Sequence, residues 1–120
     1  MSPHILIVED DSATRDALAL LLAASGYATD TAADGHQALT YLRSHPAPGV
    51  VLLDLLMPVE DGWQFLAERH KDAALAAIPV LVLSAAGLAL RPAALALGAD
   101  DFLAKPASPE DLLAAIANYC

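Results

Sequence analysis

Apolar and polar positions alternate along the chain in blocks of two kinds. Short runs rich in Val, Ile and Leu, which are typical of strands, alternate with longer segments whose apolar residues recur every three or four positions. The short runs are residues 4–8, 27–31, 50–54, 78–84 and 101–104. The longer segments predict five amphipathic helices, one after each strand.

Several residues mark the expected helix ends. Ser12 is the predicted N-cap of the first helix, and Gly26 suits the left-handed position after it. Asp34 opens the second helix with Gln37 three residues on, a variant of the capping box. The last helix has Ser108 as its predicted N-cap, followed by proline and two acids.

Regular alternation of strands and helices predicts an α/β fold. The central strands are almost wholly apolar, which indicates a parallel sheet covered by helices on both faces. The third helix is expected to begin at Asp61 or Gly62, and the fourth to span about residues 89–97 and end at Gly98. No linker, repeat or low-complexity tract interrupts the pattern, so residues 1–120 are interpreted as one domain.

Charge and composition exclude several classes of function. The net charge is −9 with only six Lys and Arg, which argues against direct nucleic-acid binding. Cys120 is the single cysteine, so no internal disulfide can form and a cytoplasmic location is expected. Residues 73–90 are uncharged, but Pro79, Ser84 and Gly87 interrupt them, which favours a helix end, a buried strand and a loop over membrane insertion.

Polar side chains stand where four of the five strands end. They are Glu9, Asp10 and Asp11 after the first strand, Asp54 ending the third, Ser84 ending the fourth and Lys105 after the fifth. Because the carboxyl ends of parallel strands share one edge of the sheet, these groups are expected to converge. Clustered carboxylates suit a hard cation, most plausibly Mg²⁺, and a lysine supplies positive charge for anionic oxygens. The set predicts phosphoryl transfer onto a carboxylate.

The motifs that carry these residues resemble a known family. "ILIVEDD", "LLDLLMPVEDG", "LSA" and "AKP", in this order, are similar to the receiver domain of response regulators in two-component signalling. The resemblance runs from about residue 4 to the end of the chain. It implies a flavodoxin-like, doubly wound (βα)5 fold with strand order 2-1-3-4-5, in which strands one and three are neighbours.

The resemblance also implies roles for individual residues. Asp54 would be the phosphoacceptor and Lys105 the partner of the phosphoryl group, with Ser84 and Phe102 as the switch residues. The bond from Lys105 to Pro106 resembles the family's cis peptide.

Metal binding follows from the same resemblance. Glu9, Asp10 and Asp54 would hold Mg²⁺ (or Mn²⁺), with the main-chain carbonyl of Leu56 as a further ligand. Leu56 and Ala86 are apolar at the two positions that flank the phosphorylation site, so slow loss of phosphate is expected.

The expected function is a phosphorylation-dependent signalling switch rather than an enzyme with an external substrate. A histidine kinase or histidine phosphotransfer protein would donate the phosphoryl group, and the surface of the fourth helix, fifth strand and fifth helix would then bind an effector protein. A receiver-like scaffold that works without phosphorylation is one alternative, and a receiver fragment of a longer regulator is another. An aspartyl-nucleophile phosphatase is disfavoured, because Leu56 stands where its second acid is expected.

Overall fold

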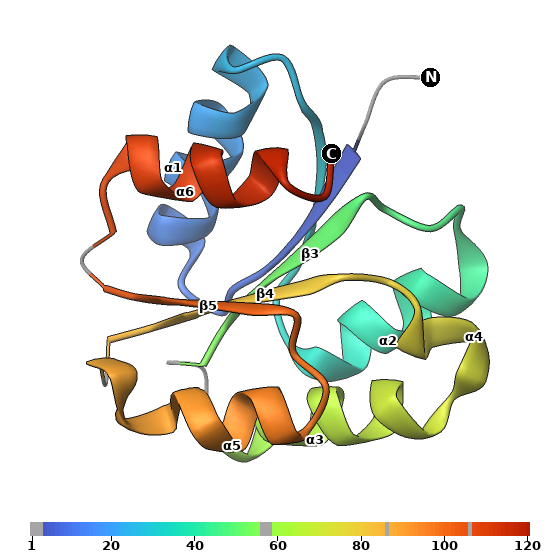
Figure 1. Ribbon diagram of the computed structural model, residues 1–120. Helices are drawn as coiled ribbons and strands as arrows, with labels where there is room; N and C mark the ends of the chain where they lie inside the picture. Colours follow the sequence, from blue (N-terminus) through green and yellow to red (C-terminus); the bar gives the residue numbers. More distant parts are fainter. Residues whose placement is uncertain (1–3, 56–58, 86, 106) are drawn as a thin grey trace.

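The computed structural model describes residues 4–55, 59–85, 87–105 and 107–120. Within them, five strands form one parallel sheet in the order β2-β1-β3-β4-β5 (Figure 1). The strands are β1 (His4–Val8), β2 (Ala28–Ala32), β3 (Val50–Asp54), β4 (Val80–Ser84) and β5 (Asp101–Ala104). The helices are α1 (Ser12–Ala24), α2 (Gly35–Ser44), α3 (Val59–Lys71), α4 (Ala73–Ala76), the 3₁₀ turn η1 (Gly87–Leu90), α5 (Arg91–Ala96) and α6 (Pro109–Ala117). The predicted α/β class and strand order are confirmed.

Apolar residues on both faces of the sheet explain why the central strands lack polar alternation. Successive side chains point to opposite faces, so Leu6 and Val8 join a core with α2, α3 and α5, while Ile5 and Ile7 join a second core with α1 and α6. In Figure 1, α1 and α6 cover one face, and the remaining helices cover the other. All residues of β3 and β4 are buried, as expected for the centre of a parallel sheet.

The predicted N-caps of α2 and α6 are found, and that of α1 is corrected. The N-cap of α1 is Asp11 and not Ser12, because the Asp11 side chain accepts the backbone N–H of Thr14. Asp34 caps α2, and the Gln37 side chain reaches back to the backbone N–H of Ala33. Ser108 caps α6, as predicted, by accepting the N–H of Asp111 at 3.1 Å.

Two glycines adopt the left-handed backbone conformation that their positions suggested. Gly26 has φ 95° after α1, and Gly98 has φ 98° after α5. Side chains with a Cβ are strained in this region, so glycine lets the chain turn sharply into β2 and β5.

The connections around β4 differ most from the prediction. Helix α3 begins at Val59, before the expected Asp61 or Gly62, and Asp72 then caps the short α4, which the sequence pattern did not predict. The expected fourth helix is divided into η1 and α5, with Pro92 in the first turn of α5. Proline has no N–H to donate and is tolerated at a helix start, which explains a new helix beginning here.

A search of the described residues for a helix long and apolar enough to cross a membrane finds none.

Candidate functional site

Three charged side chains meet at the carboxyl edge of the sheet. Asp54 ends β3 and is 2% exposed, and Glu9, directly after β1, is 3% exposed. Lys105 follows β5 and directs its ammonium to both acids, with Nζ 2.6 Å from Asp54 Oδ2 and 4.0 Å from Glu9 Oε1. The strand order explains why these side chains meet. The strand that ends at Asp54, β3, is the neighbour of β1, which precedes Glu9, and is separated by β4 alone from β5, which precedes Lys105.

The backbone fixes these residues in position. The N–H of Lys105 donates to the carbonyl of Ser84 at 2.8 Å, which continues the pairing of β5 with β4 past the last strand residue. The N–H of Glu9 donates to the carbonyl of Ala32 at 3.0 Å. The carbonyl of Glu9 accepts from the Arg15 guanidinium at 3.0 Å, so α1 also holds this loop.

The pKa of Glu9 is strongly perturbed. Burial raises the pKa of Glu9 to about 8, and the hydrogen bond and negative charge of Asp54 act in the same direction. The Asp11 N–H and the charge of Lys105 lower this pKa, but they do not offset the burial. Glu9 is therefore expected to keep its proton at neutral pH and to share it with Asp54 through the hydrogen bond between the two side chains.

The neighbouring acids of the same loop have different surroundings. Asp10 is exposed. Asp11 accepts two hydrogen bonds from Thr14, one from its hydroxyl at 2.6 Å and one from its N–H at 2.8 Å, and these bonds lower the pKa of Asp11. Asp11 is thus a capping residue at the start of α1.

The two predicted switch residues are both buried. Ser84 is 1% exposed at the end of β4, and Phe102 is 5% exposed on β5, in the core shared with α5. The predicted switch residue Phe102 therefore already lies inside the core in this structure. Three predictions concern residues that lie outside the described part of the chain. They are the main-chain carbonyl of Leu56 as a metal ligand, the apolar residues Leu56 and Ala86 beside the phosphorylation site, and the cis peptide before Pro106.

The donor atoms at this edge have the chemistry that Mg²⁺ requires, since Glu9, Asp10 and Asp54 all offer carboxylate oxygens. Within the part of the chain that the structure describes, no three His, Cys, Asp or Glu side chains are grouped as a metal site. In this conformation the Lys105 ammonium bonds to the Asp54 oxygen. The carboxylate oxygens fit Mg²⁺. The exposed Asp10 side chain would have to move toward Glu9 and Asp54 for the three acids to form a metal site.

Sequence reasoning missed the burial of Arg69 at the opposite edge of the sheet. This side chain is 2% exposed, and its guanidinium donates to the carbonyls of Ala76, Ile78 and Gly98. It also pairs with Asp100 at 3.1 Å. The signal was its spacing, because Arg69 lies three and four residues after the apolar Leu66 and Phe65 on the inward face of α3.

The strand order and the helices on both faces are those of the flavodoxin-like α/β class, here with buried acids and a lysine at the carboxyl edge of the sheet. The family model for the response regulator receiver domain matches residues 5–117. This chain therefore belongs to the receiver-domain family of two-component signalling.

Curated relatives agree with this assignment. The probable transcriptional regulator ycf27 of Guillardia theta is 41% identical over 113 residues, which cover 93% of this chain and 43% of the relative. The response regulator Rre1 of Synechocystis is 36% identical over 116 residues, covering 95% of this chain and 50% of the relative. The chain spans about half the length of the curated relatives it matches.

Solved structures share the fold over its full extent. The chemotaxis protein CheY4 of Vibrio cholerae has a TM-score of 0.88 and 28% identity, with both chains fully covered. The receiver domain of the sensor histidine kinase PA1611 of Pseudomonas aeruginosa has a TM-score of 0.87 and 28% identity, covering 99% of this chain and 98% of that one. The latter structure has a magnesium ion in its active-site cleft.

Proposed function

We propose that this chain is a phosphorylation-dependent switch in which Asp54 accepts a phosphoryl group from a histidine kinase or a histidine phosphotransfer protein. The observation that supports this most is the contact of 2.6 Å between Lys105 Nζ and the buried Asp54 carboxylate. A buried carboxylate needs a compensating charge, and a lysine can transfer its contact to a new anion, because its ammonium is a point charge on a flexible stem.

The proposed transfer is a displacement at phosphorus. An Asp54 carboxylate oxygen forms the new bond to phosphorus, the phosphorus–nitrogen bond of the donor phosphohistidine breaks, and its electron pair leaves with the imidazole. Lys105 then pairs with a phosphoryl oxygen. Glu9, Asp10 and Asp54 would hold Mg²⁺ (or Mn²⁺), which when bound offsets the negative charge of the transferring group.

The conformational signal is proposed to begin at the same contacts. Ser84 and Lys105 stand at the ends of adjacent strands, so a phosphoryl group on Asp54 offers both a new anionic partner. Phe102 is already buried, and we therefore assign the signal to the new contacts of Ser84 and Lys105 and not to an inward turn of the aromatic ring. The responding surface is formed by α5, β5 and α6, next to Leu88, which is 64% exposed.

One alternative is an outcome of the test, because a scaffold that binds its partner without phosphorylation would leave Asp54 unmodified. A receiver that belongs to a longer regulator is the other alternative, and it would be phosphorylated in the same way and pass the signal to an attached domain. In either version, residues 1–120 act as one cytoplasmic receiver domain that turns over no external substrate and binds no nucleic acid directly.

Acetyl phosphate with Mg²⁺ tests the proposal without knowledge of the partner. Intact mass spectrometry is expected to show the gain of one phosphoryl group in the wild type and none in Asp54→Asn. The exposed acid Asp16 provides the matched control, since Asp16→Asn is expected to react as the wild type does. No gain in the wild type, or an equal gain in Asp54→Asn, would contradict the proposal.

A further inference from the structure

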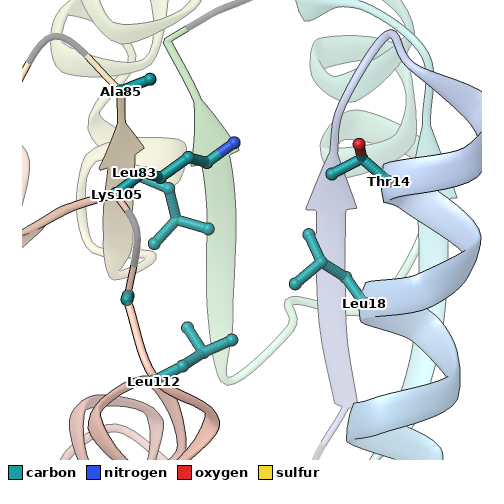
Figure 2. Close-up of a pocket in the computed structure, with 7 residues that line it drawn as sticks. Thr14, Leu18, Leu83, Ala85, Lys105 and Leu112 are labelled. Carbon is teal, nitrogen blue, oxygen red and sulfur yellow. The ribbon is translucent and has the colours of Figure 1, made fainter.

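A cavity of about 550 Å³ that is open to solvent lies between α1 and the carboxyl ends of β4 and β5, on the face that α6 also covers. Its lining residues are Thr14, Leu18, Leu83, Ala85, Lys105, Ala107 and Leu112. Figure 2 shows the leucine side chains converging on one space, with Lys105 and Thr14 at one end and Leu112 at the other. Two of the lining residues, Ala85 and Ala107, have small side chains, so a larger residue at either position would take up part of this space.

The size and lining of this cavity match those of small-molecule sites. Pockets that hold organic ligands have volumes of roughly 300–1,000 Å³ and combine apolar walls with few polar groups. A far smaller apolar cavity, of about 150 Å³, is enough to hold benzene. Here Leu18, Leu83 and Leu112 supply the apolar walls, and the Lys105 ammonium is the hydrogen-bond donor at one end.

Charge selects the kind of ligand. An anion would approach Lys105 but would also meet Asp54 and Glu9, which contact the same ammonium, and Asp11, which is bonded to the lining residue Thr14. A cation would meet the Lys105 ammonium first. An uncharged molecule avoids both penalties, and a carbonyl or hydroxyl oxygen on it can accept one of the ammonium hydrogens that Asp54 leaves available.

We propose that this cavity is a binding site for a small uncharged molecule with an apolar body. The site is separate from the phosphoacceptor, yet it shares the side chain of Lys105 with it. A ligand in the cavity would therefore restrict the movement of Lys105 away from Asp54. This coupling rests on the proposed function, whereas the binding itself does not.

A pair of fluorescent dyes tests the binding. N-phenyl-1-naphthylamine is uncharged, and 1-anilinonaphthalene-8-sulfonate has the same body with an added sulfonate. The unphosphorylated 120-residue chain is expected to bind the uncharged dye saturably at one site, and to bind the sulfonate analogue about tenfold more weakly or less. Equal affinity for the two dyes would overturn the assignment of an uncharged ligand.

Filling the cavity provides the variant test. Ala107→Phe places a ring in the empty space and is expected to weaken binding of the uncharged dye by about tenfold or more. Ala114→Phe adds the same ring to an exposed position of α6 and is expected to leave the affinity unchanged. If Ala107→Phe folds by circular dichroism and binds the dye as the wild type does, the proposal is wrong.

Methyl NMR of the wild type keeps the test independent of any variant. Addition of the uncharged dye is expected to shift the methyl signals of Leu18, Leu83 and Leu112 while leaving those of Leu39 and Leu42, in the opposite core, in place. Absence of these shifts would overturn the proposal. So would shifts that follow dilution of the protein instead of dye addition, because a second copy of the chain would then fill the cavity.

Discussion

The two ends of the sheet each hold a basic side chain, and the two charges are held in opposite ways. At the amino end, Arg69 is enclosed by three carbonyls and Asp100, so its planar guanidinium has a fixed partner in nearly every direction. At the carboxyl end, Lys105 is 24% exposed and contacts two acids that share a proton. The first arrangement suits permanent structure, and the second suits exchange of partners.

This difference follows from the chemistry of the two residues. An arginine is always charged and its donors point in fixed directions, which match the carbonyls of Ala76, Ile78 and Gly98 around it. A lysine carries a compact charge that can turn from one oxygen to another. The comparison suggests two uses of charge: the buried Arg69 stabilises the fold, and the partly exposed Lys105 serves the proposed phosphoryl transfer.

Loss of the amino-end charge is expected to have the largest effect on stability. Arg69→Ala removes the donors of several carbonyls and leaves Asp100 without its cation, so the free energy of unfolding should fall by about 3–5 kcal/mol in urea denaturation. Arg43 provides the control, because it is exposed and 3.9 Å from Asp72, and Arg43→Ala should change stability little. If both variants lose the same small amount of stability, Arg69 is not the structural charge that the comparison of the two ends requires.

Loss of the carboxyl-end charge is expected to cost less. Lys105→Met should lower the free energy of unfolding by about 1 kcal/mol at neutral pH, because the lysine is partly solvated and the shared proton already reduces the repulsion of Glu9 and Asp54. The same variant should lose phosphorylation by acetyl phosphate. A stability loss as large as that of Arg69→Ala would show that Lys105 is a structural charge as well.

The pH dependence of stability sharpens the comparison further. Glu9 in the unfolded chain ionises near its ordinary pKa of 4.5, whereas the folded protein keeps the proton up to about pH 8. Between these values the folded state binds more protons, so stability is expected to fall as pH rises, by about 2–3 kcal/mol between pH 6 and 9. Urea denaturation across this range checks the slope, and Glu9→Gln should flatten it. A rise in stability over the same range would contradict the shared proton.

The smallest effect is expected at the acid that only caps a helix. Asp11→Ala removes the acceptor of both Thr14 hydrogen bonds, so amide hydrogen exchange in the first turn of α1 should become faster. Ser12→Ala should leave these rates nearly unchanged, because Asp11 and not Ser12 is the N-cap. Faster exchange in Ser12→Ala than in Asp11→Ala would reverse this assignment.

Sequence patterns predicted the fold and the residues of the candidate site. They did not predict the protonation of those residues or the packing around them. The apolar strands and the residues at their ends are local features, so the sequence alone could place Asp54, Glu9 and Lys105 at one edge of the sheet. The proton shared by Glu9 and Asp54, the inward position of Phe102 and the cavity beside Ala107 depend on packing between distant segments. The burial of Arg69 also depends on tertiary contacts, whereas Pro92 is a local signal for the division of the fourth helix.

Chemical trapping of the modified residue tests the central claim most directly. Borohydride reduces an aspartyl phosphate to homoserine, so the wild type treated with acetyl phosphate and Mg²⁺ and then reduced can be sequenced by tandem mass spectrometry. Homoserine is expected at position 54 and nowhere else, and Lys105→Met should reduce its yield strongly. Homoserine at another acid, or none at position 54, would contradict the claim that the ion pair of Asp54 and Lys105 marks a phosphoacceptor.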